Sequence, residues 1–136
     1  MIKERYKPKL DEEYWAIDTN GEVECVTAYP QEVIDWDFLI GNCFETYEEA
    51  EEYKKHIEYT ARYKNNIEEH SEPIDWNSCQ SKYSVFYSTS KEQIGVEDSE
   101  YYKDQGTIYA SSEQIIWDAI KEIGEDNFKK YVLEVK

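Results

Sequence analysis

Two histidines, three cysteines and 31 carboxylates are the side chains of this 136-residue sequence that are suited to catalysis or metal binding. His56 and His70 have no serine or cysteine partner in the local sequence and no further ligands at the spacing of a metal site. Cys25, Cys43 and Cys79 match neither a zinc module nor a disulfide framework, so reduced thiols fit best. Cys25 and Cys43 are predicted to be small buried hydrophobic side chains. We therefore expect no catalytic residues, no metal site and no bound cofactor.

The carboxylates are too frequent for any one pair to indicate an acid and a base. They outnumber the 15 Lys and Arg and give a formal net charge of -16. Between Asp11 and Tyr53 there are 14 carboxylates and no Lys or Arg. This segregation predicts one strongly negative face and argues against direct binding to nucleic acid or to anionic lipid. A partner attracted by charge would be basic.

Carboxylates held on strands and a helix can imitate the closely spaced charge of duplex DNA and occupy a groove lined with Lys and Arg. The 13 Tyr and four Trp add rigid aromatic anchors of the kind that protein interfaces favour. The alternative is that the acidity serves solubility and the aromatic side chains fill the core. The residues predicted to contact a partner are Asp35, Asp37, Glu45, Tyr47, Glu48, Glu51 and Glu52.

The first part of the chain is expected to contain a basic arm and a hairpin. Residues 1–10 carry four cations and are predicted to be irregular or loosely attached. Strands over 14–17 and 23–29 flank Asn20-Gly21, which indicates a type I′ turn with positive φ at both central residues. The apolar and acidic stretch 31–40 is predicted to be an irregular loop or one helical turn. A third short strand is expected over 41–45.

A long helix is predicted from Tyr47 to Glu69, with Thr46 as its N-cap and Glu49 completing a capping box. Its expected apolar stripe consists of Ala50, Tyr53, Ile57, Thr60, Lys64 and Ile67.

The second part repeats this order. Strands are predicted over 82–87 and 93–97, a short strand over 107–110, and a helix capped by Ser111 with Gln114. The buried stripe of that helix is predicted to be Ile116, Ala119, Ile120 and Ile123, with Gly124 after its end. A last turn around Phe128 and Tyr131 is expected, followed by a terminal strand over 132–135.

These elements predict an α+β fold in which antiparallel sheets carry one long and one shorter capped helix. We expect a single domain over 11–136, made of two related ββ(β)α halves, 11–70 and 80–136, that follow the basic arm 1–10. No apolar run approaches the roughly 18 residues that span a bilayer, and the N-terminus lacks the apolar core of a signal peptide. The sequence therefore predicts a soluble cytoplasmic protein that does not act at a membrane.

Three segments resemble a family of small proteins encoded by phages and prophages of Gram-positive bacteria. They are Tyr14-Trp-Ala-Ile-Asp-Thr-Asn-Gly-Glu22, Ile40-Gly-Asn-Cys-Phe-Glu-Thr-Tyr-Glu-Glu-Ala-Glu51, and residues 106–114 continuing to 123–131. The resemblance covers most of the chain after the arm and implies an accessory protein acting in the cytoplasm of an infected bacterium. It supplies no active-site residues.

By analogy with small acidic phage proteins, we expect a non-enzymatic inhibitor of a host defence protein. Its target would be a nucleic-acid-binding protein such as a CRISPR effector or a restriction nuclease, so that its type would be anti-CRISPR or anti-restriction. Two alternatives remain open: a structural or assembly role, and capture of a small nucleotide in a pocket where Tyr and Trp stack on a base. The oligomeric state is not predicted.

Overall fold

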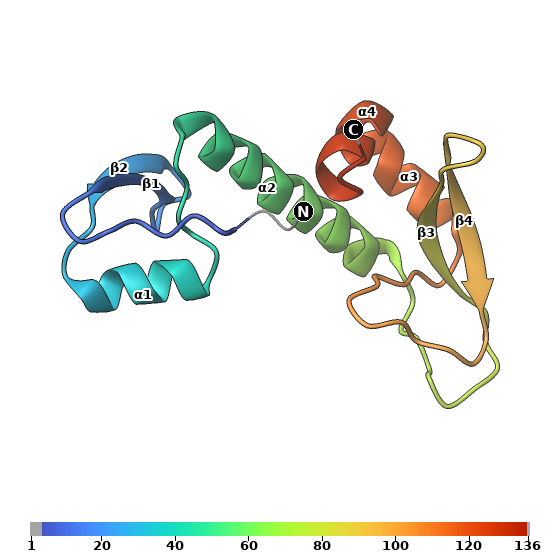
Figure 1. The fold of residues 1–136 in the computed structure, drawn as a ribbon. Coiled ribbons are helices and arrows are strands. Elements are labelled where there is room, and N and C mark those ends of the chain that lie inside the picture. Colours follow the sequence, from blue (N-terminus) through green and yellow to red (C-terminus); the bar gives the residue numbers. More distant parts are fainter. Residues whose placement is uncertain (1–3, 136) are drawn as a thin grey trace. The chain divides into compact units, whose positions relative to one another are not determined.

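The computed structural model describes residues 4–135 and has an α+β fold (Figure 1). The contacts within the chain divide it into two compact units, Met1–Lys55 and His56–Lys136. The boundary falls inside the long helix α2 (Tyr47–His70) rather than in the segment 71–79 that separates the expected halves.

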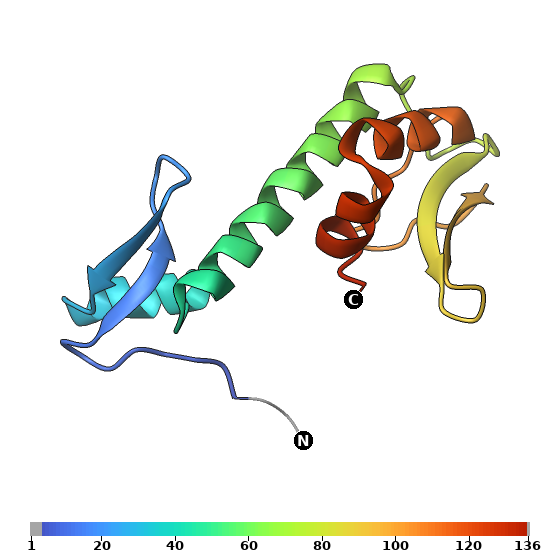
Figure 2. The same ribbon diagram turned by 90° about the horizontal axis from the view of Figure 1, so that it is seen from above.

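In the first unit, helix α1 packs against one antiparallel hairpin. Strands β1 (Glu13–Ile17) and β2 (Val23–Thr27) pair antiparallel, as the sequence predicts, and α1 (Gln31–Leu39) lies along them (Figures 1 and 2). The small core of the unit consists of the buried side chains Tyr14, Ala16, Ala28 and Ile34.

The turn of this hairpin differs from the predicted type I′ turn. Gly21 has a positive φ of 80°, but Asn20 does not. The backbone N–H of Asp18 donates to Glu22 O at 2.8 Å, which leaves a three-residue loop. Such loops place a single left-handed residue after an ordinary turn, and Gly21 fills that position. The Asp18 carboxylate also accepts from the backbone N–H groups of Asn20 and Glu22.

The prediction of an irregular loop or one helical turn over 31–40 is wrong, because this segment forms the nine-residue helix α1. Ile34 points into the core and is fully buried, whereas other large apolar side chains of α1 are exposed. Apolar side chains on more than one side hide the single stripe that marks an amphipathic helix. The strand predicted over 41–45 is reduced to one antiparallel bridge between Trp15 and Phe44.

Helix α2 is confirmed with its predicted cap, since the backbone N–H of Glu49 donates to Thr46 Oγ1 at 3.2 Å. Its predicted apolar stripe is only partly correct. Ala50 and Ile67 are buried as predicted, but Ile57 is 46% exposed. Lys64 is exposed as well, and the neighbouring Tyr63 is buried in its place.

In the second unit, another antiparallel hairpin packs against helix α3. Strands β3 (Lys82–Ser88) and β4 (Gln93–Ser99) form the hairpin, and α3 (Glu113–Ile123) lies against β3 (Figure 2). Ile116, Ala119, Ile120 and Ile123 are the buried residues of α3, as the sequence predicts.

The chain ends in short helical turns rather than in the expected terminal strand. The three-residue helix α4 (Glu125–Asn127) is followed by a π-helix, Phe128–Val132. Glu134 then has a positive φ of 55°, which is incompatible with an extended strand. The strand predicted over 107–110 is likewise a single bridge, between Tyr83 and Ala110.

The N-cap of α3 lies one residue later than predicted. Ser112 Oγ accepts from the N–H of Ile115, whereas Ser111 Oγ accepts from the N–H of Glu72. The hydroxyl of Ser111 is therefore used to tie the loop after α2 to the start of α3.

We expect Ser112→Ala to destabilise α3 by about 1 kcal/mol, because it removes an N-cap. Amide hydrogen exchange at Ile115 should accelerate in this variant, and much less in Ser111→Ala. Equal acceleration in the two variants would contradict the assignment of the cap.

The two units share a local arrangement. In each, the first hairpin strand forms an antiparallel bridge to the residue two positions before a helix cap, Phe44 before Thr46 and Ala110 before Ser112. A common origin of the two halves stays a prediction. Within residues 4–135, no helix is both long and apolar enough to cross a membrane.

Candidate interaction surface

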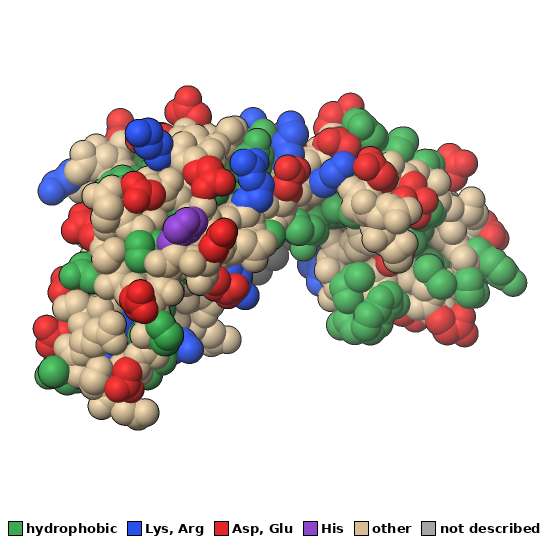
Figure 3. Space-filling view, turned by 180° about the vertical axis from the view of Figure 1, so that it is seen from behind, with side chains coloured by type: hydrophobic (Ala, Val, Ile, Leu, Met, Phe, Trp, Pro, Cys, Tyr) green, Lys and Arg blue, Asp and Glu red, His purple; other side chains and the backbone are tan. Residues whose placement is uncertain are grey.

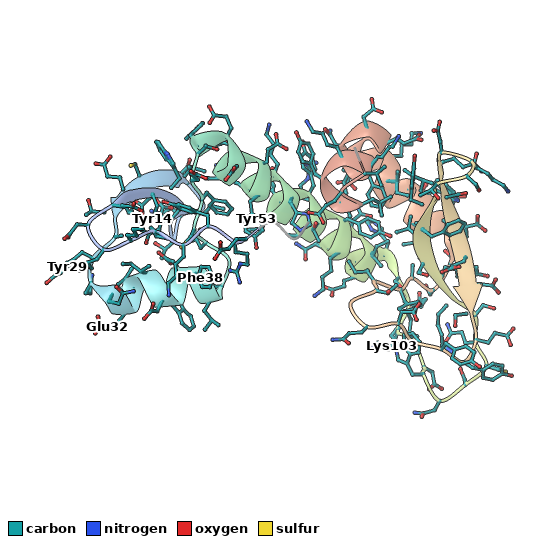
Figure 4. The ribbon with its side chains drawn as sticks, in the orientation of Figure 1. Tyr14, Tyr29, Glu32, Phe38, Tyr53 and Lys103 are labelled. Carbon is teal, nitrogen blue, oxygen red and sulfur yellow. The ribbon has the colours of Figure 1, made fainter. Side chains whose placement is uncertain are left out.

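Five large apolar side chains are exposed on and next to α1. They are Tyr29 (69%), Val33 (44%), Trp36 (60%), Leu39 (71%) and Ile40 (48%), and together they are called the α1 face below. Val33, Trp36 and the C-cap residue Ile40 follow steps of three and four, which places their side chains on one side of α1, and Tyr29 precedes the helix. Figure 3 shows hydrophobic side chains gathered on the surface over α1, and Tyr29 projects outward in Figure 4.

A concave site of about 540 Å³ adjoins the α1 face and is called the Trp36 pocket. Three carboxylates, from Asp18, Glu24 and Asp37, line it together with Trp36 and Ile40. None of its lining residues is a Lys or Arg. An indole beside carboxylates suits a guanidinium or ammonium group, through cation–π contact and charge-assisted hydrogen bonds.

Two of the three carboxylates of this pocket, those of Asp37 and Asp18, are held in place by hydrogen bonds within the unit. Asp37 Oδ2 accepts from the Tyr14 hydroxyl at 2.5 Å, and Asp18 Oδ1 accepts two backbone N–H groups at 2.8 and 2.9 Å. Burial, followed by this bond to Asp37, raises the pKa of Tyr14, so the phenol remains a donor at neutral pH. The Asn42 side chain bonds both the N–H and the carbonyl of Ile17. The pocket is therefore preorganised for binding.

The seven predicted contact residues fall into two groups. Asp35 and Asp37 belong to α1, and the other five surround the start of α2. Within the second group, Glu45, Glu48 and Glu52 are exposed, while Glu51 is half-buried.

Tyr47 is 44% exposed and meets the ring of Trp15 edge to face at 5.3 Å. Hydrogen bonding to Glu51, together with the charge of that carboxylate, raises the pKa of Tyr47. This tyrosine therefore remains protonated next to an acidic side chain.

The basic arm neutralises part of the acidic segment. Lys7 Nζ lies 2.8 Å from Asp35 Oδ1, and this hydrogen bond, together with one from Gln31, lowers the pKa of Asp35. Arg5 donates to Phe38 O and lies over the Phe38 ring at 4.1 Å. Residues 4–10 form no helix or strand, in agreement with the predicted irregular arm, and Lys7 and Arg5 attach them to α1, whereas residues 1–3 lie outside the described part. Asp35 is therefore engaged within the chain and less available to a partner.

The residues that sequence reasoning missed are mainly those of the α1 face and of the Trp36 pocket. Among them are Trp36, Leu39, Asp18 and Glu24. The spacing of 33, 36 and 40 is the available signal, but the prediction of an irregular loop or one helical turn for this segment conceals it.

The histidines have structural contacts. His56 Nδ1 lies 2.6 Å from Tyr131 O, and His70 Nδ1 lies 2.9 Å from Asn66 O. Among residues 4–135, no group of three or more His, Cys, Asp and Glu is arranged to hold a metal ion.

The cysteines differ in exposure. Cys25 and Cys43 are both predicted to be buried, but Cys43 is only partly buried, packed against the core of the first unit, and Cys25 is exposed. Cys25 is exposed because α1 covers the other side of its hairpin, where Tyr14 and Ala16 point.

We expect Cys43 to react with a thiol reagent much more slowly than Cys25 and Cys79 at pH 8. Burial, and then the charge of Asp37, raises the pKa of Cys43 from 9.0 to about 11, so little thiolate is present. Its reaction should accelerate as the pH approaches 11. Because the raised pKa favours the protonated folded state, this thiol's contribution to stability should decline between pH 9 and 11. Mass spectrometry of alkylated peptides would measure the rates, and equal rates at pH 8 would contradict the prediction.

Comparison with known proteins adds no family to this description. No protein-family model matches the chain, and neither the curated proteins nor the solved structures contain a significant match. The resemblance to small phage proteins stays a prediction.

Proposed function

We propose that the protein is a non-enzymatic inhibitor that binds a basic protein through its first unit and keeps nucleic acid from that partner's binding surface. The observation that carries this proposal is the exposed α1 face bordered by the three carboxylates of the Trp36 pocket. Exposed apolar side chains next to acidic ones suit a partner surface that combines Lys or Arg with apolar contacts.

The distribution of charge supports this choice of partner. Met1–Lys55 contains 15 Asp and Glu against six Lys and Arg. Glu45, Glu48 and Glu52 remain exposed at the start of α2, beyond the part that the arm neutralises. The proposed partner is a host defence protein, such as a CRISPR effector or a restriction nuclease, in the cytoplasm of an infected Gram-positive bacterium.

Self-assembly through the α1 face is the competing function. An exposed apolar face favours it, but it would bring together two copies of a unit with the same excess of carboxylates. Sedimentation at micromolar concentration separates the two, since a monomer disfavours assembly.

Affinity capture from a lysate of a Gram-positive host with known defence systems tests the proposal. The tagged protein should recover a basic nucleic-acid-binding protein at low salt, and should lose it at high salt or when duplex DNA is added. If neither high salt nor duplex DNA reduces the amount of partner recovered, the proposal of nucleic-acid mimicry is wrong.

Trp36→Ala should reduce the affinity for the captured partner by about tenfold or more, because large exposed aromatics at an interface centre often contribute over 1 kcal/mol. The stability of the free protein should barely change, since Trp36 is already 60% exposed. Tyr102→Ala in the second unit, at a side chain that is 79% exposed, is the matched control. Equal recovery with both variants would remove the α1 face from the interface.

A further inference from the structure

Two hydroxyl groups in the second unit are buried without a hydrogen-bond partner, Tyr63 OH and Thr60 Oγ1. Tyr63 is 1% exposed and packs against the Phe128 ring at 4.9 Å. Burial raises the pKa of Tyr63, which keeps the phenol protonated as a donor. Buried polar groups in folded proteins are nearly always paired, so two adjacent exceptions call for an explanation.

Both residues line the same cavity of about 200 Å³, called the Tyr63 cavity. Its other walls are largely apolar and include Val85, Ile108 and Val132. An unpaired hydroxyl would be satisfied by a ligand that fills such a cavity and carries hydrogen-bonding atoms at its inner edge.

A groove of about 770 Å³ shares Thr60 and the segment 106–108 with the Tyr63 cavity. Trp76 and Tyr109 line the groove, with their rings edge to face at 4.9 Å. Lys103, on the loop after β4 (Figure 4), places its Nζ 5.1 Å from the centre of the Trp76 ring. The cavity and the groove together therefore form one concave site within the second unit.

The charged side chains of the groove are of both signs. Lys64, Lys103, Glu68 and Glu72 line it, and Lys64 Nζ lies 3.9 Å from Glu68 Oε1. A ligand that carries both hydroxyls and an anionic group matches this mixture, because carboxylates accept from sugar hydroxyls and lysines bind phosphate.

We propose that the second unit binds a mononucleotide. Its base enters the Tyr63 cavity and bonds the hydroxyls of Tyr63 and Thr60, its ribose lies near Glu68 and Glu72, and its phosphate lies near Lys103. A heteroaromatic base supplies both donors and acceptors on an otherwise apolar ring, which suits this cavity. The site is separate from the interface proposed for the first unit.

Calorimetric titration of the full chain with AMP, GMP, CMP and UMP, and with the four matching nucleosides, tests this proposal. At least one nucleotide should bind saturably and shift the backbone NMR signals of residues 106–108. Lys103→Ala should weaken binding of that nucleotide but not of its nucleoside. Absence of saturable binding at millimolar concentration, or equal affinity for nucleotide and nucleoside, would overturn the proposal.

Tyr63→Phe distinguishes a ligand contact from a structural one. Binding should weaken about tenfold, as expected for a lost buried hydrogen bond, while the ligand-free chain should be no less stable because the hydroxyl has no partner there. Thr60→Val should act in the same direction, and Tyr59→Phe, outside the cavity, should leave binding unchanged. A marked loss of stability in ligand-free Tyr63→Phe, or unchanged binding, would overturn the proposal.

Discussion

Changing Glu45, Glu48, Glu51 and Glu52 to Lys should reduce the affinity for the captured basic partner by about a hundredfold or more. Steering between opposite charges raises association rates by about 10 to 1,000-fold, and this variant replaces attraction by repulsion. Three of the four carboxylates are exposed in the free protein, so they lose few internal contacts on replacement. The amount of partner recovered, measured by quantitative mass spectrometry across a salt series, gives the result.

The matched control carries the same charge change in the second unit. Glu58, Glu69, Glu97 and Asp98 are all exposed, and changing them to Lys alters the net charge equally. If both variants lose the partner alike, the interaction depends on overall charge and not on the start of α2. A Gln version of the first variant removes the carboxylates without adding cations, and circular dichroism would verify that each variant folds.

Retained binding in the folded Lys variant would refute nucleic-acid mimicry by these residues. Weakened binding that still depends on salt would show that other carboxylates, such as those of α1, also contribute. Asp35 is already paired with Lys7, so the α1 carboxylates left for a partner are Asp37, in the Trp36 pocket, and the exposed Glu32.

The elements that the sequence predicts correctly are those with apolar residues on one side only. All four buried residues of α3 are predicted correctly because these core positions recur at helical spacing and the exposed positions of the helix are polar. The two hairpins are confirmed because strand residues flank turn residues. The cap of α2 is confirmed because its hydroxyl and its amide are local in sequence.

The candidate site was harder to predict for a physical reason. Helix α1 buries Ile34 but exposes the apolar side chains of Val33 and Trp36, so its apolar residues do not form the single stripe that marks an amphipathic helix. Where local pattern fails, a binding surface is a common cause, because selection for binding overrides selection for burial. The sequence prediction also included Asp35 among the acids available to a partner. It could not foresee that Lys7 of the basic arm pairs with Asp35, because this contact depends on tertiary structure.

Buried Lys82 could not be foreseen from its position in a strand. Its side chain is fully buried, and its Nζ donates to Ser78 O at 2.9 Å and to Glu100 O at 2.7 Å. It also lies 5.3 Å from the centre of the Trp76 ring. One ammonium group thus joins the loop before β3 to the end of β4.

Lys82→Ala should destabilise the second unit by about 3 kcal/mol, because hydrogen bonds to a charged group and a buried side chain are lost together. Lys82→Met keeps most of the volume and should cost less, and the difference separates packing from hydrogen bonding. Lys91→Met, at an exposed position of the β3–β4 turn, is the control and should be neutral. Urea unfolding followed by amide exchange in β3 and β4 would measure these changes.

Lys82 also holds two loops that carry residues of the groove in the second unit, Trp76 and Lys103. The loop that Lys82 holds through Ser78 carries Trp76, and its second acceptor, Glu100, lies three residues before Lys103. Loss of the ammonium should therefore loosen both of these walls before the unit unfolds, and amide exchange at residues 75–80 and 100–104 should accelerate first. Unchanged exchange there in Lys82→Met would show that packing around Trp76, and not the buried cation, holds the two loops together.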